Sequence, residues 1–135
     1  MADALNTVVL FSGPNYYVTL TNNLSDGTGD TELIVDKSTL TGPSGAAPSH
    51  IVIEELTYDI NGFEGVKVVA DTSNAGTDLV LAQLSGSGYR DFRPYGGLKA
   101  TNVDGTGDIS FVTVSTGAGA SGDSYSITMK CRLKA

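Results

Sequence analysis

This chain of 135 residues has one cysteine, one histidine, no tryptophan and no long apolar run. The single cysteine, Cys131, cannot form an intramolecular disulfide, so packing or a partner has to supply the stability. No segment approaches the roughly 18 to 20 apolar residues that span a bilayer. Near the N-terminus, Asp3 stands where a signal peptide would carry positive charge. We therefore expect a soluble protein that folds in a reducing cytosol, without classical export and without a membrane partner.

Positive charge is also scarce. The chain has 8 Lys and Arg residues against 15 Asp and Glu residues, which gives a formal net charge of −7. The basic residues are scattered, and the densest group, Lys130, Arg132 and Lys134, lies near the C-terminus. A nucleic-acid backbone would be repelled by such a chain unless a basic patch were concentrated somewhere. We expect no nucleic-acid partner.

The sequence has no sustained apolar stripe at helical spacing, whereas a period of two is clear in several places. Near the C-terminus, Tyr125, Ile127, Met129, Cys131 and Leu133 alternate with polar residues. This alternation predicts a strand over 125–133 with one buried face.

Further strand patterns occur nearer the N-terminus. Residues 16–21 and 66–70 alternate, and the apolar runs 33–35, 79–84 and 109–114 are typical of strands buried on both faces. Residues 1–11 are expected to form an arm or an edge strand. Most of the 17 glycines lie between these segments, as in turns. The fold class predicted is all-β, a single domain over residues 1–135 with an antiparallel β-sandwich or jelly-roll-like arrangement of about eight strands.

One strand shows a break in its alternation. Ile51 and Ile53 follow one phase, and Leu56, Tyr58 and Ile60 follow the other. A β-bulge near residues 54 and 55 would reconcile the two phases. The segment 41–49, which contains two prolines, is the longest irregular stretch and is expected to extend from the body.

The pentapeptide Asp-Gly-Thr-Gly-Asp occurs twice, at residues 26–30 and 104–108, and each copy leads into a predicted strand. In the second copy, Asn102, Asp104 and Thr106 have the spacing of an EF-hand loop, but Thr113 occupies the position of the final acid. Asp and Gly in this pattern favour tight turns. We predict no calcium site, although these two segments are the ones that warrant a metal titration.

The residues that could carry catalysis are few. His50 is the only histidine, and no nucleophile motif accompanies it. Glu54 and Glu55 are adjacent, and only a bulge could bring both onto one face for acid–base chemistry. One histidine and one cysteine cannot form a zinc site without several carboxylates. We predict no enzyme, no catalytic residue, no metal ligand and no cofactor.

Three aromatic residues, Tyr89, Phe92 and Tyr95, lie among Arg90, Asp91 and Arg93. They could form a platform on which a sugar ring stacks. The interpretation we favour is that they anchor a long loop onto the sandwich, because aromatic residues supply much of the burial in small β domains.

Several turn and strand motifs together resemble a family of small structural proteins of the virions of tailed bacteriophages. They are the segments 56–62 (Leu-x-Tyr-x-Ile-x-Gly), 84–92 (Leu-Ser-Gly-Ser-Gly-Tyr-Arg-Asp-Phe), 96–98 (Gly-Gly-Leu), 106–109 (Thr-Gly-Asp-Ile) and 125–127 (Tyr-Ser-Ile). The resemblance covers about the second two-thirds of the chain. It implies a head decoration or cement protein, located on the capsid exterior and assembled in the host cytoplasm. The implied partners are the major capsid protein and other copies of the chain, in a trimer if the threefold sites of the lattice are used.

Two alternatives stay open. One is a tail, baseplate or fibre-associated subunit of the same virion. The other is a carbohydrate-binding adhesion module that uses the residues from Tyr89 to Tyr95.

Overall fold

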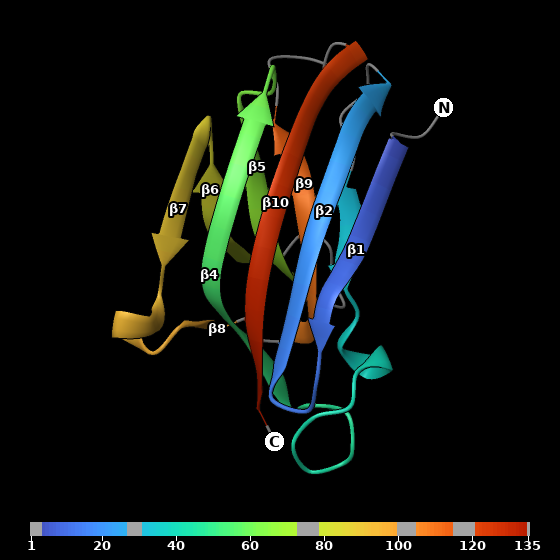
Figure 1. The fold of residues 1–135 in the computed structure, drawn as a ribbon, viewed down its shortest axis with the longest axis vertical. Coiled ribbons are helices and arrows are strands. Elements are labelled where there is room, and N and C mark those ends of the chain that lie inside the picture. The colour runs from blue at the N-terminus through green and yellow to red at the C-terminus, as the bar shows by residue number, and fades with distance from the viewer. Residues whose placement is uncertain (1–3, 27–30, 73–78, 100–104, 115–120, 135) are drawn as a thin grey trace.

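The protein is a β-sandwich of two antiparallel sheets, and in Figure 1 the sheet that contains β10 lies in front of the sheet that contains β9. The structure is a computed structural model, and it describes residues 4–26, 31–72, 79–99, 105–114 and 121–134. Sheet A has six strands and sheet B has four. The all-β prediction is confirmed.

The strands of sheet A follow the order β1, β2, β10, β4 and β7, with the short β8 also paired to β4. Their bounds are Ala4–Ser12 (β1), Tyr16–Asp26 (β2), Ser121–Lys134 (β10), His50–Asn61 (β4), Ser87–Asp91 (β7) and Leu98–Lys99 (β8). Sheet B follows the order β3 (Thr31–Val35), β9 (Gly105–Val114), β5 (Gly65–Thr72) and β6 (Leu79–Leu84). The connections that the structure describes contain the 3₁₀ turns η1 (Lys37–Thr39) and η3 (Arg93–Tyr95).

The pairing has the nested order of a jelly roll. β5 pairs with β6 as an inner hairpin, and around it β4 pairs with β7, β3 with β9, and β2 with β10. Each successive pair belongs to the opposite sheet from the pair before, so a long double ribbon is wound around the core. This is the double-sheet arrangement of jelly rolls, in which both sheets keep open edges. β1 is an addition to it and extends sheet A beyond β2.

The core fills the space between the sheets. The inward-facing residues of β10 meet apolar residues of sheet B, and Tyr125, Phe111 and Ile127 are among the side chains with 2% exposure or less. The ring of Phe111 meets that of Tyr125 edge-on, with centroids 6.0 Å apart and planes at 75°. Such aromatic contacts add to the free energy gained from burial.

Two sequence predictions about individual strands are confirmed. The residues of β10 from Tyr125 to Leu133 alternate between buried and more accessible positions. In β4, Lys130 is paired with Glu55 and Cys131 with Ile53, so the extra residue of the bulge is Glu54. The break in alternation therefore located the bulge correctly.

Other details differ from the prediction. The described residues form ten strands, not about eight, because β7 and β8 form within the stretch expected to be a loop. β3 and β6 lie at the edges of sheet B and are not buried on both faces: Leu33, Leu79 and Val80 are all exposed. Residues 41–49 lie beyond the ends of the strands in Figure 1, and the backbone N–H of Ser49 bonds to the carbonyl of Lys134.

Candidate interaction surface

The outer face of sheet A, which points away from the core, changes character from one side to the other. The strand registers place the side chains in rows that cross the sheet. One such row contains, from β1 to β7, Phe11, Val18, Lys130, Glu55 and Asp91. It begins with apolar residues and ends with charged ones.

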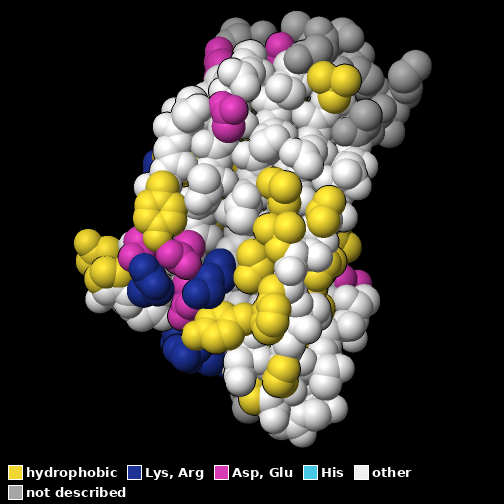
Figure 2. Space-filling view, viewed as in Figure 1, with side chains coloured by type: hydrophobic (Ala, Val, Ile, Leu, Met, Phe, Trp, Pro, Cys, Tyr) yellow, Lys and Arg dark blue, Asp and Glu magenta, His cyan; other side chains and the backbone are white. Residues whose placement is uncertain are grey.

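The apolar side of this surface is formed by β1 and β2, and we call it the β1–β2 face. It consists of Val8, Phe11, Tyr16, Val18 and Leu20. Val8 is 41% exposed and Phe11 is 55% exposed. Figure 2 shows these apolar side chains as a group over β1 and β2, next to the charged residues. A contiguous exposed apolar area of this kind marks an interaction site more often than scattered single residues do.

The charged side is a network of alternating charges on β4, β7, β10 and the turn η3. The Arg93 guanidinium is bidentate on Asp91, with two N···O distances of 2.9 Å, and lies 3.4 Å from Glu55. Lys130 Nζ lies 3.6 Å from Glu55 and 3.9 Å from Glu54. Arg132 Nη1 lies 3.8 Å from Glu54. Three cations therefore face three carboxylates, and the local charge is balanced.

Tyr16 joins the two sides. Lys130 Nζ lies 4.9 Å from the centre of its ring, and the Arg132 guanidinium carbon lies 5.5 Å from it. Cations over an aromatic face are held by the ring quadrupole. Lys130 and Arg132 are thus engaged with Tyr16 and the glutamates, so the described residues of this face form no basic stripe.

Hydrogen bonding and charge set the titration of Glu55. The hydrogen bond from the Tyr89 hydroxyl is the main cause that holds the pKa of Glu55 below its usual value, with Arg93 and Lys130 contributing. The same bond raises the pKa of Tyr89. The pKa of Asp91 is lowered by its hydrogen bonds from Arg93.

The bulge brings Glu54 and Glu55 onto one face, which a regular strand would not do. Their surroundings do not suit proton transfer, however. A general acid needs a raised pKa, whereas the pKa of Glu55 is lowered by its neighbours. The pair acts in the structure as the acidic part of the ion-pair network.

The three aromatic residues of the segment 89–95 have different environments. Phe92 packs against the core, as the anchoring interpretation predicted. Tyr89 and Tyr95 do not anchor anything by burial, since they are 55% and 83% exposed. Tyr89 faces outward because its partner in the register is the exposed Thr57, and Tyr95 lies in η3.

His50 begins β4, at the junction expected for it. Its Nδ1 lies 3.0 Å from the hydroxyl of Ser49. Burial, followed by the charges of Lys99, Lys134 and Lys37, lowers the pKa of His50. A catalytic histidine of the usual triad is oriented by a carboxylate, whereas the charges that act on His50 are cationic.

Most of the first copy of the pentapeptide, residues 27–30, and the first residue of the second copy, Asp104, lie outside the described residues. In the second copy, β9 begins at Gly105, so this part belongs to the strand itself. The Asp108 carboxylate accepts a 2.8 Å hydrogen bond from the backbone N–H of Lys37, and Gly107 has a φ of +83°. No cluster of three or more His, Cys, Asp or Glu residues that could hold a metal occurs within the part of the chain that the structure describes.

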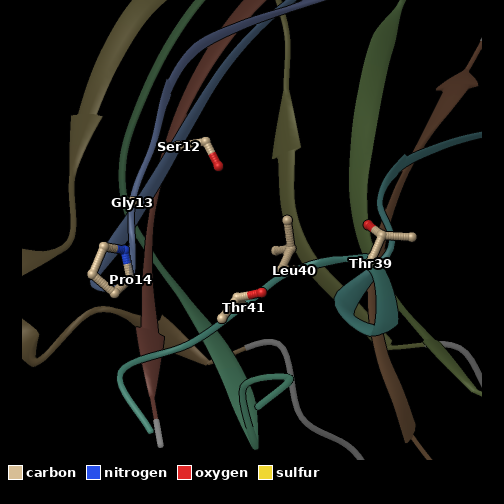
Figure 3. Close-up of a pocket in the computed structure, with 6 residues that line it drawn as sticks. All are labelled: Ser12, Gly13, Pro14, Thr39, Leu40 and Thr41. Carbon is tan, nitrogen blue, oxygen red and sulfur yellow. The ribbon is translucent and has the colours of Figure 1, made fainter. Parts of the chain in front are cut away.

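A shallow pocket of about 300 Å³ lies at the end of the sandwich near the β1–β2 turn. Its lining comes from two facing segments, residues 12–14 and residues 39–41, as Figure 3 shows. Hydroxyl groups and small apolar groups line it, without a charged side chain. It has none of the titratable groups that chemistry would require.

Cys131 lies on the inner face of β10 and is fully buried, as its phase with Ile127 and Met129 indicates. Burial raises the pKa of its thiol to about 12. Such a thiol is unreactive, because the thiolate is the nucleophilic form. Over the described ranges, no helix has the length and apolar character to cross a membrane.

Comparison of this chain with family models, with curated proteins and with solved structures finds no match.

Proposed function

We propose that this protein is a structural subunit of a tailed-phage virion, a decoration or cement protein that binds the major capsid protein on the outer surface of the head. The observation that carries the proposal is the β1–β2 face, an apolar area on the outer side of sheet A beside a charge-balanced network. The resemblance in the sequence motifs supports the same role. Jelly rolls also recur in viral capsid domains, which is an analogy of fold alone.

Many weak contacts, repeated over the shell, would hold the protein on the head. A rigid sheet face can bury Phe11, Val18 and Leu20 against a capsid subunit, and burial of apolar area favours association. When many copies bind only the assembled shell, they stabilise that state by mass action. The net charge of −7 keeps unbound copies apart and away from DNA.

The test uses mature heads of the encoding phage that lack this protein. We expect the purified chain to co-sediment with the heads and to raise their disruption temperature. Leu20→Lys, which places a charge within the β1–β2 face, should weaken binding at least tenfold. Gln83→Lys, at an exposed position of sheet B, serves as the matched control and should bind like the unmodified chain.

The alternative positions in the virion give different results. Binding to tails, or to no part of the virion, would contradict the proposal. Immunogold labelling or cryo-EM of whole virions distinguishes a head location from a tail, baseplate or fibre location.

A second function is favoured by one observation, the exposure of Tyr89 and Tyr95. Exposed tyrosine rings near the Asp91–Arg93 pair resemble the stacking and polar groups of a carbohydrate site. A glycan array tests it: specific binding that is lost in both Tyr89→Ala and Tyr95→Ala would support an adhesion module. Absence of binding to every glycan would remove this candidate.

A further inference from the structure

One edge of sheet A is formed by β1. This strand stands at one end of the order of sheet A, and among the described residues it pairs with β2 alone. With nine residues it is longer than the other edge strands, since β3 and β7 have five residues each and β6 has six. The unpaired N–H and C=O groups of a long edge strand are a template for a further strand.

Proteins usually protect such edges with charge, proline or bulges. β7 contains Arg90 and Asp91, and β3 contains Glu32. β6 is uncharged like β1, but it has only six residues and is interrupted by a bulge at Leu81. β1 contains neither a charged residue nor a proline, and its one irregularity is the bulge at Leu10. The regular part, residues 4–9, is an unprotected edge about 20 Å long at roughly 3.4 Å per residue.

The side chains of β1 are exposed on both faces of the strand. Val8 lies on the outer face and is 41% exposed, whereas Val9 lies on the inner face and is 49% exposed. A partner that covers only one face would leave the other exposed. A strand that pairs along the edge places its own side chains next to those of β1 on both faces of the sheet.

The distribution of charge identifies the partner. Residues 4–25 contain no Asp, Glu, Lys, Arg or His, although the chain as a whole carries a net charge of −7. Two copies of an acidic protein repel one another least where each is uncharged. The β1 edge is such a region, and an antiparallel pair of identical strands is complementary to itself.

We propose that β1 pairs with β1 of a second copy, antiparallel and across a twofold axis, and so joins two six-stranded sheets into one. When this twofold axis is perpendicular to the sheet, the two β1 strands run antiparallel and the outer faces of both copies lie on the same side. The two β1–β2 faces therefore meet as one larger apolar surface on the same side. This contact joins copies in pairs, so it differs from the trimer that threefold sites of a lattice would favour. It does not depend on the proposed virion role.

The test measures the mass of the full chain by sedimentation equilibrium over about 5 to 200 µM, the range suited to a small interface. We expect a reversible monomer–dimer equilibrium. Val9→Lys places an inward-facing charge on the edge, a device that natural edge strands use against pairing. It should weaken the dimer at least tenfold, whereas Leu33→Lys, at a similarly exposed position of edge strand β3, should not.

Salt dependence provides a second measurement on the unmodified chain. Because the edge is uncharged and the copies are acidic, raising NaCl from 50 to 500 mM should strengthen the dimer or leave it unchanged. A dimer held by the Glu54, Glu55 and Arg93 network would weaken instead, and that result would overturn the proposal.

Hydrogen exchange locates the contact without a substitution. Amides of residues 4–9 should become more protected as concentration rises, while those of β3 and β6 stay unchanged. A monomer at 200 µM, a trimer that Val9→Lys leaves intact, or concentration-dependent protection confined to other strands would each overturn the proposal. Circular dichroism confirms that both lysine variants retain the fold.

Discussion

The hydroxyl of Tyr89 donates a 2.5 Å hydrogen bond to Oε1 of Glu55 and thereby ties the edge strand β7 to β4. Both residues lie on the outer face of sheet A, where Arg93 and Lys130 also approach the Glu55 carboxylate. The bond favours the ionised form of Glu55, so its strength is coupled to pH.

The first prediction concerns acid stability. The folded pKa of Glu55 lies below its usual value of 4.5, so its ionised form stabilises the fold above about pH 4.5, and this contribution is lost as pH falls through the folded pKa. We expect the free energy of unfolding to decrease between about pH 5 and pH 3. Glu55→Gln should make this decrease smaller, as measured by urea unfolding at each pH in low salt.

Tyr89→Phe refines this experiment, because it removes the hydroxyl and keeps the ring. The pKa of Glu55, followed by NMR of its carboxyl carbon, should rise toward its usual value in this variant. Glu64→Gln is the control for Glu55→Gln, because it also removes a carboxylate but at an exposed position between β4 and β5. An unchanged Glu55 pKa in Tyr89→Phe would show that the bond does not set the titration.

The second prediction compares two phenylalanines. Phe111 is fully buried and packs edge-on against Tyr125, whereas Phe11 is 55% exposed on the β1–β2 face. Phe111→Ala should lower the free energy of unfolding by about 3 to 5 kcal/mol, because it removes a buried ring and leaves a cavity. Phe11→Ala should change it by no more than about 0.5 kcal/mol. Equal losses in denaturant unfolding would mean that Phe11 is buried in solution.

The third prediction concerns two glycines with similar backbone angles. Gly97 has a φ of +87° and Gly45 a φ of +85°, a region that costs other residues about 1 to 2 kcal/mol. A Cβ on Gly97 would lie 2.1 Å from Cγ1 of Val52, whereas one on Gly45 would meet nothing within 4 Å. Gly97→Ala should therefore be more destabilising than Gly45→Ala by about 1 to 3 kcal/mol. Thermal or urea unfolding measures the difference, and equal destabilisation would show that the loop moves away from Val52.

The fourth prediction concerns Cys131, whose buried thiol has a pKa raised to about 12. At pH 8 the folded protein should not react with iodoacetamide over hours, and it should react within minutes in guanidinium chloride. Thr128→Cys, on the outer face of the same strand, should add one reactive thiol under native conditions. Rapid labelling of Cys131 in the folded unmodified chain would contradict its burial.

The sequence was most informative where one strand has one buried face. In β10 the alternation from Tyr125 to Leu133 reports burial directly, since every second residue faces sheet B. In β4 the change of phase between Ile53 and Leu56 required an inserted residue, and the register places it at Glu54. Local pattern was sufficient in both cases.

The local sequence pattern did not predict strands whose formation or position depends on pairing with distant strands. β7 has five residues, and its aromatic residue Tyr89 faces outward, so no apolar alternation marks the strand. Its partner β4 begins 37 positions earlier, at His50, and the spacing of apolar residues contains no information on that pairing. Apolar runs in β3 and β6 likewise could not show that these strands lie at the edges of a sheet.

The interaction surface was also beyond local prediction. Lys130 and Glu55 are 75 residues apart in the sequence, and only the register between β10 and β4 brings them together. The adjacency of Glu54 and Glu55 was visible, and so was the condition that a bulge had to be present. The cationic partners of Glu54 and Glu55 could not be predicted from the sequence, because the order of strands across sheet A determines which residues lie next to them.

The central position of β10 has a consequence for how the chain folds during synthesis. β10 lies between β2 and β4, so these two strands acquire their shared neighbour only after residues 121–134 have been made. Until then, each has a free edge that can pair with another chain, and pairing over such long sequence distances is slow. A nascent chain that has not yet released β10 therefore carries two long unpaired strand edges that favour aggregation.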